Sequence, residues 1–142
     1  MTIADILQSK GSEVLTISGD TSVRDAVALL AERRIGALPV TRGGAIAGIM
    51  SERDIIYRLQ SDGAGILDWT VERIMTAPAI TVTPSTEIMS ALSLMTRRRI
   101  RHLPVVEGEA MVGLVSIGDL VKFRMDKIEA EAAAMLNYIQ SV

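Results

Sequence analysis

The chain has 142 residues, 49% of them hydrophobic and 23% charged, with a formal net charge of −2, one histidine and no cysteine. This length suffices for one domain that folds without disulfides, and the small net charge argues against a broad nucleic-acid-binding surface. The longest apolar runs are strand-sized and the first ten residues lack the basic start of a signal peptide, so we expect a cytoplasmic protein without a membrane span.

An internal repeat determines the order of the predicted elements. Residues 16–54 align without a gap on residues 81–119, at an offset of 65. The identical pairs include Arg34/Arg99, Leu38/Leu103, Pro39/Pro104, Gly48/Gly113, Ser51/Ser116 and Asp54/Asp119. Such self-similarity predicts two copies of one structural unit.

Each copy is predicted to begin with a short strand, at residues 14–17 and 79–82, followed by a turn and a helix. The helices are predicted from apolar residues at the spacing i, i+3, i+4 and i+7, which gives each helix one buried stripe. These residues are Val23, Ala26, Val27 and Leu30 in the first copy, and Ile88, Ala91, Leu92 and Met95 in the second.

A β-hairpin and a second helix complete each copy. The hairpin strands are expected at residues 37–41 and 45–50, and at residues 103–106 and 110–115, with glycine in both turns. The second helix is expected to begin at Ser51 or Ser116. The first of these ends near Gln60, and the other continues to about Met135 because no breaker interrupts it.

The predicted fold class is α/β (α+β), built from two βαββα units. The parts are the first copy at residues 6–60, a connector at 61–75, the second copy at 76–125 and a C-terminal helix extension at 126–142. The connector is expected to be partly helical, with Trp69 buried. The extension is rich in Ala, Glu, Met and Leu, and this composition favours packing on a second subunit.

The motif Ser-x-x-Asp follows the last strand of each copy, as Ser51 with Asp54 and as Ser116 with Asp119. In the structural interpretation it is a capping box, which stabilises a helix start by about 1 kcal/mol. In the functional interpretation the carboxylate accepts the two hydroxyls of a ribose, near helix N–H groups that favour an anion. One motif alone favours the cap, but its recurrence in both copies favours the site. The glycines three residues earlier, Gly48 and Gly113, would let a ligand approach the strand.

The copies differ where the hairpin begins, with Gly36-Ala37 in the first and Arg101-His102 in the second. An arginine and the only histidine are suited to clamp a phosphate. The alternative is a solvated basic helix end, which we favour for Arg97 and Arg98.

Signatures of catalysis and metal binding are absent from the sequence. The spacing Gly43-x-x-x-x-Gly48 resembles the start of a P-loop, but Ile49-Met50 stand where lysine and serine or threonine are required. One histidine and no cysteine exclude a Cys/His pair and a His-rich metal site. We therefore expect no catalytic residue, no metal and no catalytic cofactor.

The repeat, the segments 35–40 (IGALPV) and 100–105 (IRHLPV), and the two Gly-x-x-Ser-x-x-Asp endings resemble a tandem pair of cystathionine-β-synthase (CBS) domains, a Bateman module. The resemblance covers about residues 6–125. It implies two repeats related by a pseudo-twofold axis, two adenosyl-ligand clefts between them, and a disk-like homodimer. Members of this family bind AMP, ADP, ATP, NAD(H) or S-adenosylmethionine and mostly regulate an effector protein.

The resemblance also assigns nucleotide-binding residues to the two clefts. The first cleft would use Asp119 for the ribose, Ser116 as its partner and Arg101 and His102 near the phosphate, with Leu15, Ile35 and Gly36 around the adenine. The second cleft would use Asp54, Ser51, Ile80, Ile100 and Met75. Lys10-Gly11 stand where the second copy has Met75-Thr76, so the clefts are expected to differ, and Lys10 is a candidate in the first. The cleft with Asp119 and Arg101 is the preferred one.

The leading hypothesis is a stand-alone regulatory module that binds AMP, ATP or NAD(H) and performs no chemistry, with an effector protein that the sequence does not identify. One alternative is a structural dimer or adaptor in which Ser-x-x-Asp is only a helix cap. A second alternative is an enzyme that turns over the bound nucleotide.

Overall fold

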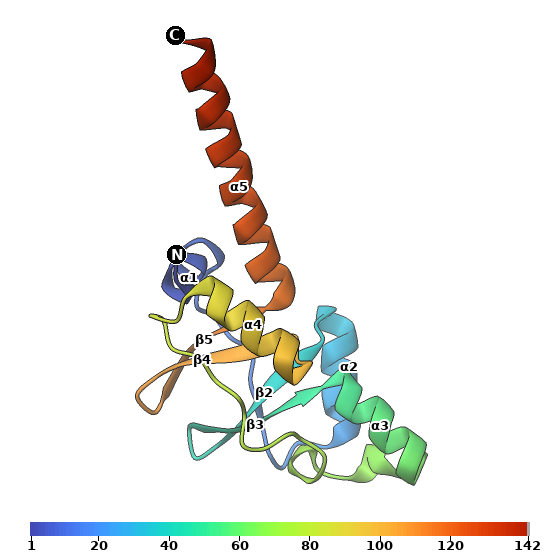
Figure 1. The fold of residues 1–142 in the computed structure, drawn as a ribbon. Helices are drawn as coiled ribbons and strands as arrows, with labels where there is room; N and C mark the ends of the chain where they lie inside the picture. Colours follow the sequence, from blue (N-terminus) through green and yellow to red (C-terminus); the bar gives the residue numbers. More distant parts are fainter. Residues whose placement is uncertain (142) are drawn as a thin grey trace.

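The first repeat folds as a three-stranded sheet with one helix before and one after its hairpin (Figure 1). The computed structural model describes residues 1–141. Gly43 and Gly44 form the hairpin turn with φ of 59° and 83°, values that favour glycine and suit the twist of a hairpin. The elements are β1 (Ile17–Ser18), α2 (Val23–Arg33), β2 (Ala37–Arg42), β3 (Ala45–Ser51) and α3 (Glu52–Asp62).

The second repeat has the same hairpin at equivalent positions. Its two strands pair antiparallel, and each hairpin contains a bulge at the same place, after Val40 and after Val105. The elements are α4 (Ile88–Arg98), β4 (His102–Glu107), β5 (Ala110–Ser116) and α5 (Ile117–Gln140). The predicted α+β fold with two repeats is confirmed, and α5 extends further than the expected end near Met135.

The strand predicted at the start of each copy is much shorter than expected. In the first copy only Ile17–Ser18 pair with β2, in parallel. In the second copy residues 79–82 form no strand, and only Val82 bridges to Val105. The prediction was wrong for residues 79–81 because, within the described chain, their backbone exchanges no hydrogen bond with β4, and only Val82 pairs, with Pro104 and Val106.

Each hydrophobic core is completed by the segment that precedes the other copy. Helix α1 (Ile3–Lys10) precedes the first copy, but its buried residues Ile3 and Ile6 belong to the core of the second. The connector carries two short 3-10 helices, η1 (Ala64–Asp68) and η2 (Val71–Arg73), and packs on the core of the first copy. The repeats therefore exchange their leading segments.

Trp69 is half-buried in the connector rather than buried as expected. The guanidinium of Arg73 lies over its ring, 3.6 Å from the centroid, which is the geometry of a cation–π contact. The indole also packs against the first core, so it lies between apolar residues and an exposed arginine.

Helix α5 leaves the body of the molecule after its first turns and extends away from it (Figure 1). Leu120 is buried in the second core, whereas every residue from Met125 to Ser141 is exposed. Among residues 1–141, no helix combines the length and apolar character needed to cross a bilayer.

Candidate functional site

Both Ser-x-x-Asp motifs form complete capping boxes. The backbone N–H of Ser51 donates to Asp54 Oδ2 at 2.9 Å, and that of Ser116 donates to Asp119 Oδ2 at 2.8 Å. In return, the Asp54 and Asp119 N–H groups donate to the serine hydroxyls, at 3.3 and 3.1 Å. The box fixes each carboxylate at the N-terminus of a helix, where the partial positive charge favours an anion.

A cavity of about 280 Å³ lies beside Asp54, between the two repeats. This volume is close to the lower end of the range for small-molecule pockets. Among the residues predicted for the second cleft, Asp54, Ser51, Ile80 and Ile100 line it. Met75 does not; its side chain packs against the first core. The neighbouring Thr76 lines the cavity, and its hydroxyl donates to Asp54 Oδ1 at 3.0 Å.

Basic side chains dominate the charged lining of this cavity. Four arginines and the histidine line it, against the two carboxylates of Asp54 and Glu52. The basic residues are Arg53, Arg98, Arg99, Arg101 and His102. Arg98, expected to be only a solvated helix end, is exposed and also lines the cavity. The helix α4 ends with Arg99 in the left-handed conformation, at φ 55°, which turns the chain toward β4 and brings these side chains together.

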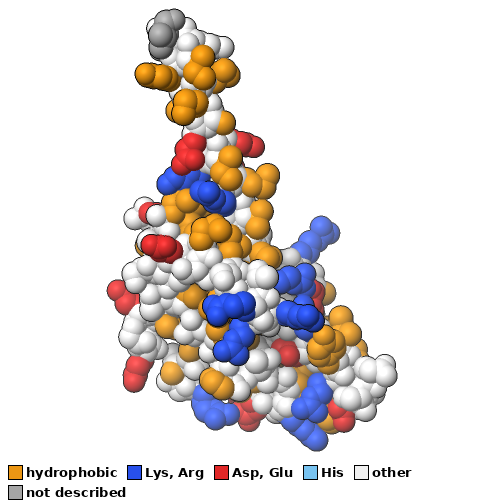
Figure 2. All heavy atoms as spheres, in the orientation of Figure 1, with side chains coloured by type: hydrophobic (Ala, Val, Ile, Leu, Met, Phe, Trp, Pro, Cys, Tyr) orange, Lys and Arg blue, Asp and Glu red, His pale blue; other side chains and the backbone are white. Residues whose placement is uncertain are grey.

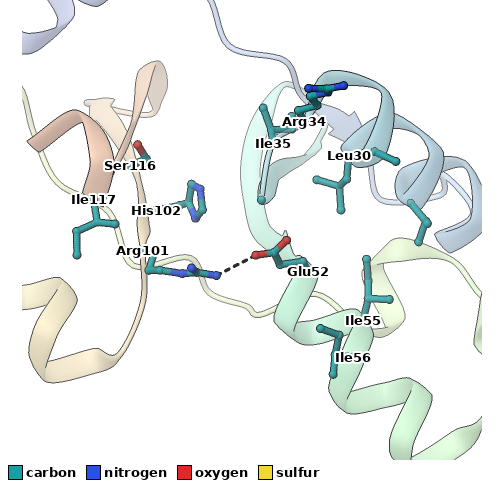
Figure 3. Close-up of a pocket in the computed structure, with 13 residues that line it drawn as sticks. Leu30, Arg34, Ile35, Glu52, Ile55, Ile56, Arg101, His102, Ser116 and Ile117 are labelled. Carbon is teal, nitrogen blue, oxygen red and sulfur yellow. Dashed lines mark hydrogen bonds and ion pairs between the residues drawn. The ribbon is translucent and has the colours of Figure 1, made fainter. Parts of the chain in front are cut away.

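A wider cavity of about 630 Å³ adjoins the first and opens between α2, α3 and the start of α5 (Figure 3). Five residues predicted for the first cleft line it: Ile35, Gly36, Arg101, His102 and Ser116. Asp119, Leu15 and Lys10 line neither cavity. The guanidinium of Arg101 pairs with Glu52 Oε1 at 2.9 Å, so one ion pair joins the two repeats across this space (Figure 3).

Lys10 binds the Asp119 carboxylate that was predicted to receive a ribose. Its Nζ lies 2.6 Å from Asp119 Oδ2 and donates to the Leu114 carbonyl at 2.7 Å. At the equivalent place of the other repeat, Thr76 performs both functions: its N–H donates to the Ile49 carbonyl and its hydroxyl to Asp54. One carboxylate therefore faces an ammonium group and the other a neutral hydroxyl.

The pKa of Asp119 reflects this ion pair. Burial alone would raise it, but the hydrogen bonds from Lys10 and from the Ser116 N–H outweigh burial, and the pKa of Asp119 lies below its ordinary value. The Asp119 carboxylate is thus ionised, and the ammonium group of Lys10 balances its charge.

His102 occupies the space left by the absent side chain of Gly36. A Cβ at position 36 would lie 3.1 Å from His102 Cε1, so a larger residue there would press on the imidazole. Burial disfavours the imidazolium and the guanidinium of Arg101 repels it, and the pKa of His102 is lowered from its ordinary value of 6.5. The ring is therefore neutral at pH 7.

Gly48 and Gly113 admit the protein's own chain, not a ligand. A Cβ on Gly48 would lie 2.6 Å from the Thr76 carbonyl oxygen, and a Cβ on Gly113 would lie 2.7 Å from Leu7 Cδ2. The expectation that these glycines let a ligand approach the strand was wrong, because the exchanged leading segments already occupy this space.

Sequence reasoning missed Glu52 and Arg53 as lining residues. Both stand inside the motif Ser51-Glu-Arg-Asp54, at the two positions that the cap does not constrain. Their charges, next to a candidate binding carboxylate, were the signal that could have identified them.

Comparison with known proteins identifies both repeats. A family model described as "CBS domain" matches twice, at residues 3–61 and 71–126. The chain is 38% identical to the CBS domain-containing protein CBSX3, mitochondrial, of Arabidopsis thaliana, over 98% of this chain and 72% of that protein. The structure of a putative signal-transduction protein with CBS domains from Burkholderia ambifaria superposes with a TM-score of 0.81 at 42% identity, covering 89% of this chain and 95% of that one.

Two further solved structures were determined with bound small molecules. The CBS domain pair of MJ0100, in complex with 5-methylthioadenosine and S-adenosyl-L-methionine, has a TM-score of 0.78 at 26% identity, over 89% of this chain and 98% of that one. CBSX2 in complex with AMP has a TM-score of 0.72 at 26% identity, over 88% of this chain and 96% of that one. With a family match over most of its length, this chain belongs to the CBS-domain proteins and carries two CBS domains.

Proposed function

We propose that this CBS pair is a regulatory module that binds an adenine nucleotide in the cavity beside Asp54 and performs no chemistry. One observation supports it most: four arginines and the Asp54 carboxylate, at the N-terminus of α3, line the same cavity between the repeats. Related CBS pairs were solved with AMP and with S-adenosyl-L-methionine.

Each part of a nucleotide has a counterpart in this lining. The Asp54 carboxylate accepts the ribose hydroxyls, of which one replaces the Thr76 hydroxyl now bonded to Oδ1. Ile80 and Ile100 offer apolar surface to the base, while Arg101, the neighbouring arginines and His102 bind phosphate. The volume of about 280 Å³ suits one nucleotide better than a dinucleotide such as NAD(H).

The charge of the lining selects among adenosyl ligands. Four arginines against two carboxylates leave the cavity positive, which attracts AMP, ADP or ATP and repels the cationic sulfonium of S-adenosylmethionine. Because ATP brings more negative charge than AMP, it is the tighter ligand in this proposal.

Calorimetric titration of the protein with AMP, ADP, ATP and S-adenosylmethionine tests the proposal. We expect binding of the nucleotides in the order ATP, ADP, AMP, no heat with S-adenosylmethionine, and weaker binding at higher salt. Absence of heat with every nucleotide at low salt would reject the sensor and favour a structural dimer or adaptor, whose capping boxes need no ligand. Chromatography of the nucleotide after long incubation checks for turnover, and a changed nucleotide would point to an enzyme.

His102 gives an independent readout of phosphate binding. Because its pKa is lowered in the folded chain, the neutral ring contributes stability that is present above pH 6.5 and is lost as the pH falls below it. We expect saturating ATP to raise the pKa of His102, since phosphate favours the imidazolium. The chain has one histidine, so the imidazole C–H resonance in a proton NMR titration of untagged protein is unambiguous. If ATP left the titration midpoint of His102 unchanged, the phosphates would not lie beside this side chain.

The proposal extends to the setting in which the module acts. We propose that the protein is a homodimer and that it transmits the presence of a bound nucleotide to an effector protein. Such signalling requires two conformations of the protein that differ in their affinity for the nucleotide. A cytoplasmic location stays a prediction, and the Arabidopsis relative is named as mitochondrial.

A further inference from the structure

The outer part of α5 is a helix without a partner in the described chain. All residues from Met125 to Ser141 are exposed, and the helix extends from the body with apolar side chains along its length (Figure 2). The exposed fraction is 54% for Met125, 48% for Ile128 and 61% for Met135. Most of the stability of a helix in a protein comes from packing of its apolar face, and within the described chain nothing packs on this part of α5.

The apolar residues on this helix follow a regular alternation of four and three residues. They are Val121, Met125, Ile128, Ala132, Met135 and Ile139. This spacing places all six on one stripe and is the pattern of a two-helix coiled coil. We name these six residues the α5 seam. Residues 132–140, AAAMLNYIQ, contain no charged side chain, which is unusual for a helix that faces only water.

The charges beside the seam indicate which partner fits it. Lys122 and Glu129 flank the seam on one side, and Arg124 and Glu131 flank it on the other. Within residues 1–141 none of the four forms an ion pair. On both sides of the seam the basic residue comes first and the acidic residue follows one heptad later. The charges of this helix therefore complement those of an identical helix that runs in the opposite direction.

Two orientations of a pair of identical helices make different use of these charges. In an antiparallel pair, positions on the same side of the seam face each other, so Lys122 meets the partner's Glu129 and Arg124 meets the partner's Glu131. In the register that aligns these charges, Val121 faces the partner's Ala132 and Met125 the partner's Ile128. A parallel pair joins only Arg124 with the partner's Glu129, and it leaves Lys122 and Glu131 without opposite charges.

We propose that the α5 seam binds the α5 seam of a second copy of this chain, with the two helices antiparallel. Gly118 lies on the same stripe one turn before Val121 and is exposed, so it leaves room for the partner's Met135. The inference specifies the interface of the proposed homodimer but does not rest on nucleotide binding.

Cysteine crosslinking tests the orientation directly, because the natural chain has no cysteine. Val121→Cys and Ala132→Cys are made separately in the full chain, and mild oxidation follows. We expect a covalent dimer only when the two variants are mixed, since like positions lie about 16 Å apart along an antiparallel pair. Crosslinking of each variant with itself would establish a parallel pair, and no crosslink in any mixture would reject the pairing of the seams.

Charge reversal tests the specificity of the pair. Glu129→Lys should weaken the dimer about tenfold, because both symmetric copies of the contact change from attraction to repulsion. Asp126→Lys makes the same change of charge on the opposite face of α5 and should leave the dimer unchanged. Reversing all four flanking charges together, in K122E/R124E/E129K/E131K, should restore it.

Analytical ultracentrifugation measures the dimer, and circular dichroism confirms that each variant is folded. Equal effects of Glu129→Lys and Asp126→Lys, or failure of the fourfold variant to recover, would overturn the inference. A dimer that binds no nucleotide would contradict the proposed nucleotide site but not the pairing of the seams. A monomer that binds ATP would contradict the pairing of the seams, and with it the proposed homodimer, but not the nucleotide site.

Discussion

Asp54→Asn should weaken ATP binding by at least about tenfold, whereas Asp119→Asn should change it by less than about twofold. Hydrogen bonds to a charged group contribute about 1.5 to 3 kcal/mol each, which corresponds to a tenfold or larger effect. Asp54 lines the cavity with the neutral hydroxyl of Thr76 as its neighbour. Asp119 is already neutralised by Lys10 and lines neither cavity. Calorimetric titration with ATP measures both variants.

The two variants control for each other. Both asparagines replace the acid of a capping box at equivalent positions, and Asp119→Asn also breaks the ion pair with Lys10, so Asp119→Asn should lose at least as much stability as Asp54→Asn. Urea unfolding measures this loss separately from binding. Equal loss of ATP binding in the two variants would show that damage to the cap, not the Asp54 site, reduces the affinity.

Lys10→Met tests why the repeats are unequal. It places at position 10 the residue type that Met75 supplies at the equivalent position of the other repeat. Without the ammonium group, burial should raise the pKa of Asp119, which carbon NMR of the carboxyl groups can follow. Retention of a low pKa in this variant would contradict the role given to Lys10.

Gly48→Ala should destabilise the protein by about 2 to 3 kcal/mol, the cost of overpacking a well-packed site. The new Cβ would lie 2.6 Å from the Thr76 carbonyl oxygen. That carbonyl is fixed, because Thr76 and Ile49 exchange two backbone hydrogen bonds of 3.0 and 2.9 Å. Urea unfolding measures this loss.

Gly113→Ala is the matched control at the equivalent position. Its Cβ would meet the end of the Leu7 side chain, a half-buried group that can rotate away. We expect a loss below about 1 kcal/mol in urea unfolding. A greater loss for Gly113→Ala than for Gly48→Ala would contradict the assignment of Thr76 as a rigid neighbour.

The parts of the fold that depend on local patterns could be predicted from the sequence. The helix stripes, the glycine turns of the hairpins and the serine caps are all encoded within a few residues of one another, and the structure places helices, hairpins and caps where they were expected. The opening strands were overestimated because β-prone composition does not show which residues meet a strand to pair with, and of residues 79–82 only Val82 bridges to β4.

Features that depend on contacts between distant segments could not be predicted. Nothing near Ile3 or Ile6 indicates that they enter the core of the second repeat rather than the first. Lys10 was noted as a departure from the other copy, but its contact with Asp119 spans 109 positions and becomes visible only when the chain is folded. The preference for the cleft at Asp119 rested on the basic residues at 101 and 102, which in fact line the cavity beside Asp54 as well.

The exchange of leading segments removes the independence that two similar repeats would otherwise have. Ile3 and Ile6 lie at one end of the chain yet belong to the core of the second repeat, and Ile66, Val71 and Ile74 lie between the repeats yet belong to the core of the first. Removing either repeat together with the segment that precedes it would therefore expose apolar core residues of the repeat that remains. We therefore expect the molecule to unfold as one cooperative unit, so that a ligand or substitution that stabilises one repeat also stabilises the other.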